Sequence, residues 1–349
     1  MYPRIEINSG KLEFNAKRLI SICKDKNITV SLVSKVLSGN KTIIERIVFS
    51  GFAHLADSRL ENLENLKDIN IPKMLLRLPM ISEAKRVVQT TDISLNSEIA
   101  TIKALNAAAS EQNTIHKIIL MFDLGDLREG IFYQENYLSF IQEVLTLNNI
   151  NLYGIGTNLT CYGGVIPDYD KLNDLIAIKN QIESKFNIKL EIISGGNSSS
   201  LYLLEDNQIP QGINNLRIGE ALFLGRETAF GKRFADLYDD AFILKAELIE
   251  VKQKPSYPIG NIHMDSFGKV PKIVDKGPMK RGILAIGKQD IYPDNLIPLG
   301  KYNIIGGSSD HIILELIDDY VIGDILSFKV NYPGLLQLMT SRYIKQIFL

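Results

Sequence analysis

One lysine in this sequence lies at the end of a predicted strand, where its amine could act as a nucleophile. Lys35 closes the mostly apolar run ITVSLVSKV, which is typical of a buried β-strand. We expect a lysine at such a strand end to be partly desolvated, which disfavours its ammonium form and makes the amine nucleophilic. An amine of this kind can form a Schiff base with an aldehyde. The alternative is a lysine that extends into solvent.

Two later apolar runs end in glycine-rich turns. EIISGGNSSSL carries Ser198 and leads into a helix, and NNLRIGEALFLG carries Arg217 and Gly219. Hydroxyl and backbone N–H groups at a helix start can bind an anion. An aldehyde-binding lysine and a phosphate site together suggest pyridoxal phosphate. Its aldehyde would meet Lys35, and its phosphate would meet Ser198 and the backbone at Gly219 and Glu220.

Polar residues also close two runs in the middle of the chain. KIILMFDLGDLREG places Arg128 shortly after Asp123, and LYGIGTN ends in Asn158. The planar fork of an arginine can pair with a carboxylate or a phenolic oxygen. The candidate site is therefore built from residues that follow several different predicted strands.

The elements that must position these residues alternate between short β runs and amphipathic helical segments. The predicted strands are Ile28–Ser34, Phe52–Ala56, Lys73–Leu78, Ile93–Leu95, Lys117–Phe122, Leu152–Thr157, Lys189–Ile193 and Asn215–Ile218. Eight such units predict a (β/α)₈ TIM barrel over residues 9–228, which places its chemistry at the carboxyl ends of its strands. A doubly wound open sheet is the alternative.

The pattern changes after about Arg226. Runs such as AFILKAELIEVKQ and GDILSFKVNY are strand-rich, are separated by Gly, Pro and Asp, and include no long helix. We therefore predict a mostly antiparallel β domain over residues 229–349. Residues 1–8 alternate in polarity, and we expect them to pair with that domain.

Composition excludes several classes of protein. The 349 residues include 39 Lys and Arg against 40 Asp and Glu, a net charge of −1. This balance argues against a nucleic-acid partner and against a polybasic membrane anchor. Two cysteines, Cys23 and Cys161, indicate a reducing compartment, most simply the cytoplasm. We find neither a secretory signal nor a membrane-spanning run.

Six motifs taken together resemble the alanine racemase family of fold-type III pyridoxal-phosphate enzymes. They occur in the family's order: SLVSKVLSGN, DLGDLREG, GIGTNLT, SGGNSSS, LRIGEALFLG and GGSSDHIILEL. The details are most similar to the ornithine racemase branch. The resemblance implies a racemase that exchanges the α-proton of ornithine or another basic amino acid between two bases while the substrate amine is bound to the cofactor.

The resemblance also implies roles for single residues. Lys35 would be the Schiff-base lysine and one of the two bases. Arg128 would contact the cofactor's phenolic oxygen and the substrate carboxylate, and Arg217 would face the pyridine nitrogen and leave it unprotonated. Asn158 stands where alanine-specific members carry a histidine under the ring.

The phosphate would be held at four positions by the same resemblance. Ser198 would contribute its side chain, while Gly219 and Glu220 would contribute backbone N–H groups. Tyr332, in the segment NYPGLL, stands where the family places a tyrosine on the phosphate.

The second base is left open. Alanine-specific members use a tyrosine from the partner subunit, but Phe267 holds that position in GNIHMDSFGKV and cannot carry a proton. Asp265 is the nearest titratable candidate, with His263 and Tyr257 behind it. Asp310 lies at a family position near the substrate carboxylate, where an acid can also bind a side-chain ammonium. A base from a second chain implies a head-to-tail homodimer.

Other functions share this scaffold. An alanine or broad-specificity racemase is one, and a D-amino-acid lyase is another. The lyases need a metal site on the β domain, and we expect none here because the later part of the chain has two histidines and no cysteine. A non-catalytic cofactor-binding protein would be a lone barrel. Four acids are candidates for selecting a basic side chain: Asp126, Glu129, Asp168 and Asp310.

Overall fold

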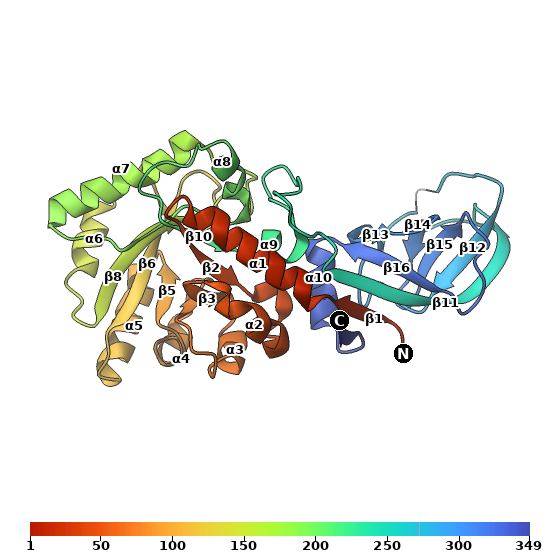
Figure 1. Cartoon of the computed structure of the whole chain (residues 1–349), viewed down its shortest axis with the longest axis horizontal. Coiled ribbons are helices and arrows are strands. Elements are labelled where there is room, and N and C mark those ends of the chain that lie inside the picture. Colours follow the sequence, from red (N-terminus) through yellow and green to blue (C-terminus); the bar gives the residue numbers. More distant parts are fainter. Residues whose placement is uncertain (272) are drawn as a thin grey trace. The chain divides into compact units, whose positions relative to one another are not determined.

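The computed structural model describes residues 1–271 and 273–349, and it divides into two compact units. One unit contains Gly10–Asp239. The other combines Met1–Ser9 with Asp240–Leu349, so both ends of the chain belong to it. Figure 1 labels many of the elements and colours each unit along the chain.

The first unit is a closed barrel of eight parallel strands, as the sequence predicts. Its strands are β2 (Thr29–Val33), β3 (His54–Asp57), β4 (Lys73–Leu75), β5 (Ile93–Asn96), β6 (His116–Asp123), β8 (Ile150–Thr157), β9 (Ile192–Ser194) and β10 (Asn215–Ile218). They pair in this order, and β10 returns to β2 to close the ring. The two-residue strand β7 (Ile131–Phe132) pairs with β6 outside the ring.

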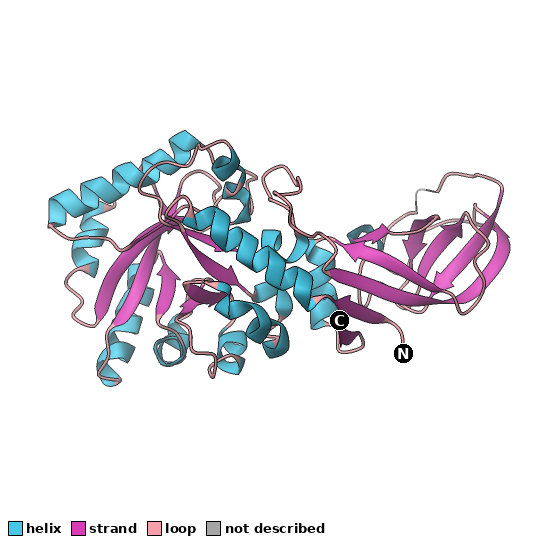
Figure 2. Ribbon diagram, in the orientation of Figure 1, coloured by secondary structure: helices cyan, strands magenta, loops and turns pink. Residues whose placement is uncertain are grey.

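Helices connect and flank these strands, as Figure 2 shows. They are α1 (Ser9–Lys24), α2 (Lys41–Ile47), α3 (Leu60–Asn65), α4 (Ala84–Thr90), α5 (Ile99–Glu111), α6 (Leu138–Val144), α7 (Tyr169–Phe186), α8 (Tyr202–Glu205) and α9 (Glu220–Leu224). Short 3₁₀ turns include η1 (Lys35–Leu37) and η4 (Ser198–Ser200). Among the described residues, no helix has both the length and the apolar character needed to cross a membrane.

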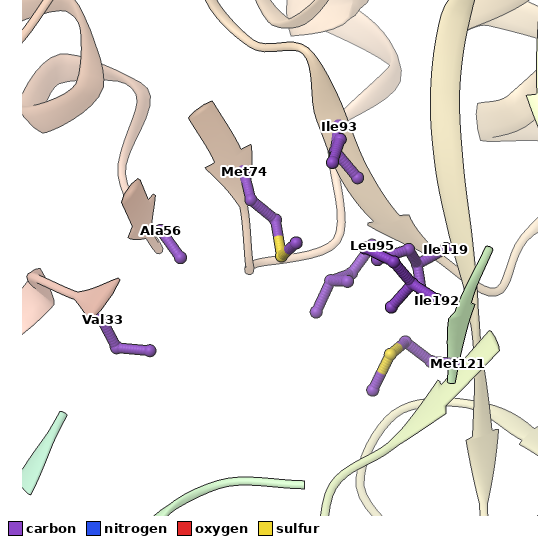
Figure 3. Packing of buried hydrophobic residues seen from close by; sticks show 8 residues of the cluster. All are labelled: Val33, Ala56, Met74, Ile93, Leu95, Ile119, Met121 and Ile192. Atoms are coloured by element: carbon purple, nitrogen blue, oxygen red, sulfur yellow. The ribbon is translucent and has the colours of Figure 1, made fainter. Parts of the chain in front are cut away.

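Apolar side chains fill part of the barrel, as Figure 3 shows. They come from strands β2 to β6 and from β9: Val33, Ala56, Met74, Ile93, Leu95, Ile119, Met121 and Ile192. Strands covered on both faces are apolar throughout, which explains runs such as KIILMF. Burying one large apolar side chain stabilises the fold by roughly 1.5–3 kcal/mol, so this cluster holds the strands that carry the candidate residues.

The second unit is a mostly antiparallel β domain. Its strands are β1 (Arg4–Ile7), β11 (Phe242–Pro255), β12 (Pro278–Leu284), β13 (Leu296–Pro298), β14 (Tyr302–Gly307), β15 (Ile312–Leu316), β16 (Ile325–Val330) and β17 (Lys345–Phe348). Strand β1 pairs antiparallel with β11 and parallel with β17. A register shift in β11 between Leu248 and Glu250 marks an irregularity against β12.

This domain also contains a helix that the sequence analysis did not anticipate. α10 (Tyr332–Thr340) begins at the N-cap Asn331, whose side chain accepts a hydrogen bond from Gly334 N at 3.0 Å. Pro333 lies in the first turn, where its missing N–H costs nothing. The capping residue and this proline were the local signals for a helix start between two strands.

Candidate active site

Lys35 lies just beyond the carboxyl end of β2. The strand ends at Val33, and the buried Ser34 donates a hydrogen bond to Asp57 Oδ2 at 2.7 Å, which fixes the chain at the exit. Lys35 then opens η1, which ends at Ser38 in the left-handed conformation. The expectation that Lys35 is partly desolvated is wrong, because its side chain starts beyond the strand and is exposed.

Glu220 is electrostatically coupled to Lys35 across neighbouring strand ends. Strands β2 and β10 pair with Leu32 opposite Ile218, and Glu220 is the first residue of α9 after β10. Burial raises the pKa of the Glu220 carboxyl to about 7, and the nearby charge of Lys35 acts to lower it. Glu220 therefore changes its charge near neutral pH beside the candidate nucleophile.

The turns after β9 and β10 form a cradle of small groups and donors. A side chain at Gly219 would meet Val33 Cβ and the Val33 carbonyl oxygen at 3.1 Å, so the backbone there has little room for anything but glycine. Ser198, 3% exposed, accepts a hydrogen bond from Ala221 N at 3.2 Å. Within the described chain, Ser199 Oγ is buried without a hydrogen-bond partner. Hydroxyl and N–H donors are the groups that a phosphate requires.

Arg217 is a buried cation with neutral acceptors. It is 4% exposed, and its guanidinium donates to Ser194 Oγ at 2.5 Å and to the Thr157 carbonyl oxygen at 2.6 Å. Burial lowers the pKa of Arg217 to about 10, against the opposing effect of the negative charge of Glu129. The group remains charged at neutral pH and holds a fixed positive charge at the end of β10.

Arg128 and Asn158 meet at one carboxylate. Arg128 donates to Glu129 Oε1 at 2.7 Å, and Asn158 Nδ2 approaches the same oxygen at 3.4 Å. Asn197 extends the network by donating to Asn158 Oδ1 at 2.8 Å. Glu129 therefore links the loop after β6 to the loops after β8 and β9.

Two of the four acids considered for substrate selection accept hydrogen bonds from backbone N–H groups. Asp126 is fully buried and accepts hydrogen bonds from three main-chain N–H groups, those of Cys161, Tyr162 and Val165. Asp168 caps α7 by accepting from Lys171 N at 2.7 Å. These carboxylates hold loops in place and leave Glu129 and Asp310 as the remaining candidates.

The β domain holds Asp265 in a tight loop. Its Oδ1 accepts hydrogen bonds from Lys269 N at 3.0 Å and Phe267 N at 2.9 Å, and Lys288 Nζ lies 3.8 Å from its Oδ2. The backbone bonds are the main cause that lowers the pKa of Asp265. Lys288 also lies 4.0 Å from the centre of the Phe267 ring. A carboxyl group with a lowered pKa is a weak proton acceptor near neutral pH.

Asp310 lies near this loop within the same unit. Lys288 N donates to the Ser308 carbonyl oxygen, and Ser309 Oγ donates to Asp310 Oδ2 at 2.7 Å. The structure thus places Lys288 in an ion pair with Asp265 and in a backbone hydrogen bond to the segment that precedes Asp310. His263 and Tyr257 are exposed, and Tyr332 is the first residue of α10. These candidates belong to the β domain, whereas Lys35 and the cradle belong to the barrel.

Sequence reasoning missed several residues that support the site. Asn197 lies inside the motif SGGNSSS, and Ser194 opens that motif. Asn215 lies two residues before Arg217 on β10, and residues two apart on a strand share a face. That spacing was the signal which could have placed Asn215 beside the buried arginine.

Comparison with known proteins identifies the family. Residues 7–227 match the family described as alanine racemase, N-terminal domain. The chain belongs to the alanine racemase family. Ornithine racemase of Acetoanaerobium sticklandii is 46% identical to it over 350 residues, which cover 99% of this chain and 99% of that protein. Lysine racemase of Thermotoga maritima is 39% identical over 353 residues, which cover 100% and 99%.

Solved structures share the fold of this family member. An alanine racemase from Bartonella henselae with covalently bound pyridoxal phosphate superimposes with a TM-score of 0.76. The match covers 100% of both chains at 17% sequence identity. At this identity the likeness concerns the fold, in which a barrel and a β domain are joined in one chain.

Proposed function

We propose that this protein is a pyridoxal-phosphate-dependent racemase of a basic amino acid, with ornithine as its substrate. The observation that carries the proposal is the convergence of Lys35, Glu220, Ser198 and Arg217 at the carboxyl ends of barrel strands. An exposed amine, a donor-rich glycine cradle and a fixed buried cation fit the aldehyde, phosphate and pyridine nitrogen of this cofactor. The full-length relatives named ornithine racemase and lysine racemase support the substrate class.

Each residue of the barrel has a task in this proposal. Lys35 holds the cofactor by its amine and moves a proton at Nζ on one face of the substrate. The cofactor, when bound, supplies the electron sink that acidifies the α-hydrogen. Arg217, as a cation, would face the ring nitrogen and limit that sink, which would restrain side reactions. Ser198 and the backbone N–H groups of Gly219 and Glu220 hold the phosphate.

Arg128 and Asn158 complete the barrel side of the site, and the family resemblance assigns Tyr332 to the phosphate. Arg128 orients the cofactor's phenolic oxygen and the substrate carboxylate. The Arg128 side chain is 41% exposed, and its ion pair with Glu129 keeps the guanidinium in one place. Asn158 approaches the same carboxylate. Asn158 would lie against the face of the cofactor ring.

The second face of the substrate requires a second proton-carrying group. Asp265, His263 and Tyr257 of the β domain are the candidates, supplied by the other chain of a head-to-tail homodimer. The lowered pKa of Asp265 makes it a weak proton acceptor in its present loop. We place the enzyme in the cytoplasm, on the grounds of its composition.

Selection of a basic side chain is assigned to Glu129 and Asp310. Both are acids that do not cap a helix or accept several backbone N–H groups among the described residues, unlike Asp126 and Asp168. A carboxylate close to the end of the substrate would pair with its ammonium. The neutral isostere norvaline lacks that group.

A panel of amino acids tests the proposal. The purified protein is incubated with pyridoxal phosphate and single L- or D-amino acids, and the products are separated by chiral chromatography. We expect ornithine to be converted in both directions and much faster than norvaline or alanine. Activity on alanine alone would contradict the substrate class. Binding of the cofactor without any racemisation would instead favour a non-catalytic role.

A further inference from the structure

A continuous hydrogen-bond chain runs through the barrel from Arg217 to a buried histidine. Arg217 Nη1 is 2.5 Å from Ser194 Oγ, which is 2.7 Å from Asn215 Oδ1. Asn215 Nδ2 is 3.1 Å from Ser31 Oγ, which is 3.1 Å from His54 Nδ1. All five residues are buried, with exposures between 0 and 8%.

Strand register builds this chain. Asn215 on β10 pairs with Ser194 on β9, and Ser31 on β2 pairs with His54 on β3. Asn215 also stands two residues before Arg217, so both side chains point to the same face of β10. The chain therefore crosses four neighbouring strands, β9, β10, β2 and β3.

The donors in the chain all point the same way. A guanidinium can only donate, so Ser194 Oγ accepts from Arg217 and sends its own hydrogen to Asn215 Oδ1. The Asn215 amide then donates to Ser31 Oγ, whose hydrogen is left for His54 Nδ1. The His54 tautomer that continues this direction accepts at Nδ1 and carries its proton on Nε2. Burial lowers the pKa of His54 to about 4, which is consistent with this neutral form.

This direction of the hydrogen bonds stabilises the positive charge of the Arg217 guanidinium, where the chain begins. Each acceptor oxygen in the chain faces toward Arg217, and aligned hydrogen bonds polarise one another. A buried cation needs this support, because its removal from water is costly and its two acceptors, Ser194 and Thr157, are neutral. Protonation of His54 at Nδ1 would reverse the last link.

We propose that Ser194, Asn215, Ser31 and His54 are positioning residues that hold the Arg217 guanidinium in place, and thereby set the affinity and the spectrum of the pyridoxal phosphate whose ring nitrogen it faces. This inference rests on the proposed function, since that function places the ring nitrogen at Arg217. None of the four residues needs to touch the cofactor.

The barrel contains a matched pair outside this chain. Ser94 Oγ lies 2.8 Å from His116 Nε2, both residues are buried, and burial lowers the pKa of His116 to about 4 as well. The hydrogen bonds of Ser94 lead to Asn96, whose Nδ2 donates to Ser94 Oγ at 2.9 Å. Among the described contacts, none continues from this pair to Arg217. Ser94→Ala is therefore a control with equal burial and an equivalent lost bond.

The experiment compares Ser31→Ala with Ser94→Ala and Ser194→Ala. The apoprotein of each variant is titrated with pyridoxal phosphate, and the dissociation constant, the visible absorption spectrum and the apoprotein melting temperature are measured. We expect Ser31→Ala and Ser94→Ala to lower the melting temperature alike. Ser31→Ala should weaken cofactor binding about two- to tenfold and shift the absorption band, while Ser94→Ala leaves both at the wild-type value.

Ser194→Ala should have the larger effect, about tenfold or more, because it removes an acceptor from a charged donor. Ser31→Ala is milder because Asn215 Nδ2 keeps Thr29 Oγ1 at 3.2 Å. His54→Asn can keep an acceptor near the Nδ1 position, so this variant should retain the wild-type spectrum. His54→Leu should behave like Ser31→Ala.

Three outcomes would overturn the proposal. If the wild type binds the cofactor and racemises ornithine but Ser31→Ala matches Ser94→Ala in affinity and spectrum, the chain is only structural and the proposed function stands. If the wild-type protein does not bind pyridoxal phosphate, both proposals fail. If Ser31→Ala does not fold, the pair His54→Leu and His54→Asn decides the same question, and equal spectra in these two variants refute it.

Discussion

A lysine at the carboxyl end of one barrel strand and a lysine at the amino end of another differ in burial and in hydrogen bonding. Lys35 follows the carboxyl end of β2 and is exposed. Lys73 is the first residue of β4 and is 9% exposed, and its Nζ donates to the backbone carbonyl oxygens of Lys67, Ile69 and Ile71. Burial lowers the pKa of Lys73. The more desolvated amine of the two is thus the one whose donors are used by the backbone.

The same contrast extends to other residues at the amino ends. His54 and His116 open β3 and β6, and each is buried with a serine partner. At the carboxyl ends, Glu220 titrates near neutral pH and Arg217 keeps neutral acceptors. Desolvation alone therefore does not mark a reactive group. Reactivity also requires that its donors and acceptors be left for a ligand.

Replacing Lys35 gives the largest expected effect. Lys35→Ala should lower racemase activity at least about a thousandfold and remove the visible band of the lysine-bound cofactor, because in the proposed function the amine is both anchor and base. Steady-state kinetics and absorption spectra check this. Lys73→Met is the matched control and should leave the band in place. A Lys35→Ala variant with a normal band and normal racemisation would remove the basis of the comparison.

The next largest expected effect is a loss of unfolding free energy on acidification, caused by His54 and His116 at the amino ends of β3 and β6. The folded protein keeps His54 and His116 neutral down to about pH 4, whereas unfolded histidine takes up a proton below about pH 6.5. Stability is therefore lost as the pH falls from about 6.5 to about 4, by up to about 3 kcal/mol for each residue. Urea unfolding at pH 7.5 and pH 4.5 measures this loss.

The histidine prediction has an internal check. Replacing His116 with Gln should reduce the difference in unfolding free energy between the two pH values, because one titrating group is gone. His263, which is exposed, provides the control variant His263→Gln, which should leave the difference unchanged. Equal pH dependence in the wild type and His116→Gln would show that the buried histidine does not cause the acid loss.

Removing Lys73 should act on stability and not on chemistry. Lys73→Met leaves three carbonyl oxygens without their shared donor and should cost about 1–3 kcal/mol of unfolding free energy. The kcat of the folded enzyme should stay at the wild-type value. Chemical denaturation and kinetics on one preparation test both statements, and a drop in kcat without loss of stability would reverse the assignment of the two barrel ends.

Glu220 gives the smallest and most diagnostic effect. Above pH 7 its carboxylate adds a negative charge beside the cradle, which opposes the approach of the cofactor's phosphate and slows its attachment. Glu220→Gln should therefore speed recombination of the apoprotein with pyridoxal phosphate about two- to fivefold at pH 8.5, with no change at pH 6. Stopped-flow absorbance measures these rates. An equal effect at both pH values would rule out coupling through the carboxyl charge.

Much of the barrel could be predicted from the sequence because its strands are buried on both faces. Runs such as KIILMF then stand out from the amphipathic helices, and Lys35, Asn158 and Arg217 could be placed at their ends. The helix α10 was missed because its nine residues lie between strands in a segment with a proline.

Side-chain contacts between neighbouring strands could not be predicted from the sequence. The bond between Ser194 and Asn215 depends on which residues of β9 and β10 pair, and a shift of one residue would turn both side chains away. The salt bridge from Arg128 to its neighbour Glu129 depends on how the loop after β6 folds back. The second base remained open because Asp265 and its alternatives lie in another unit, and the role proposed for them requires a second chain.

The pairing of β1 with β11 and β17 also concerns the order in which the protein is made. Residues Arg4–Ile7 leave the ribosome long before their strand partners Phe242–Lys245 and Lys345–Phe348 are synthesised. At roughly 5–20 residues per second, this first strand waits on the order of ten seconds or more for a partner. The barrel, Gly10–Asp239, is complete in the meantime. A nascent chain stalled before β17 would therefore carry a finished barrel and an unfinished β domain.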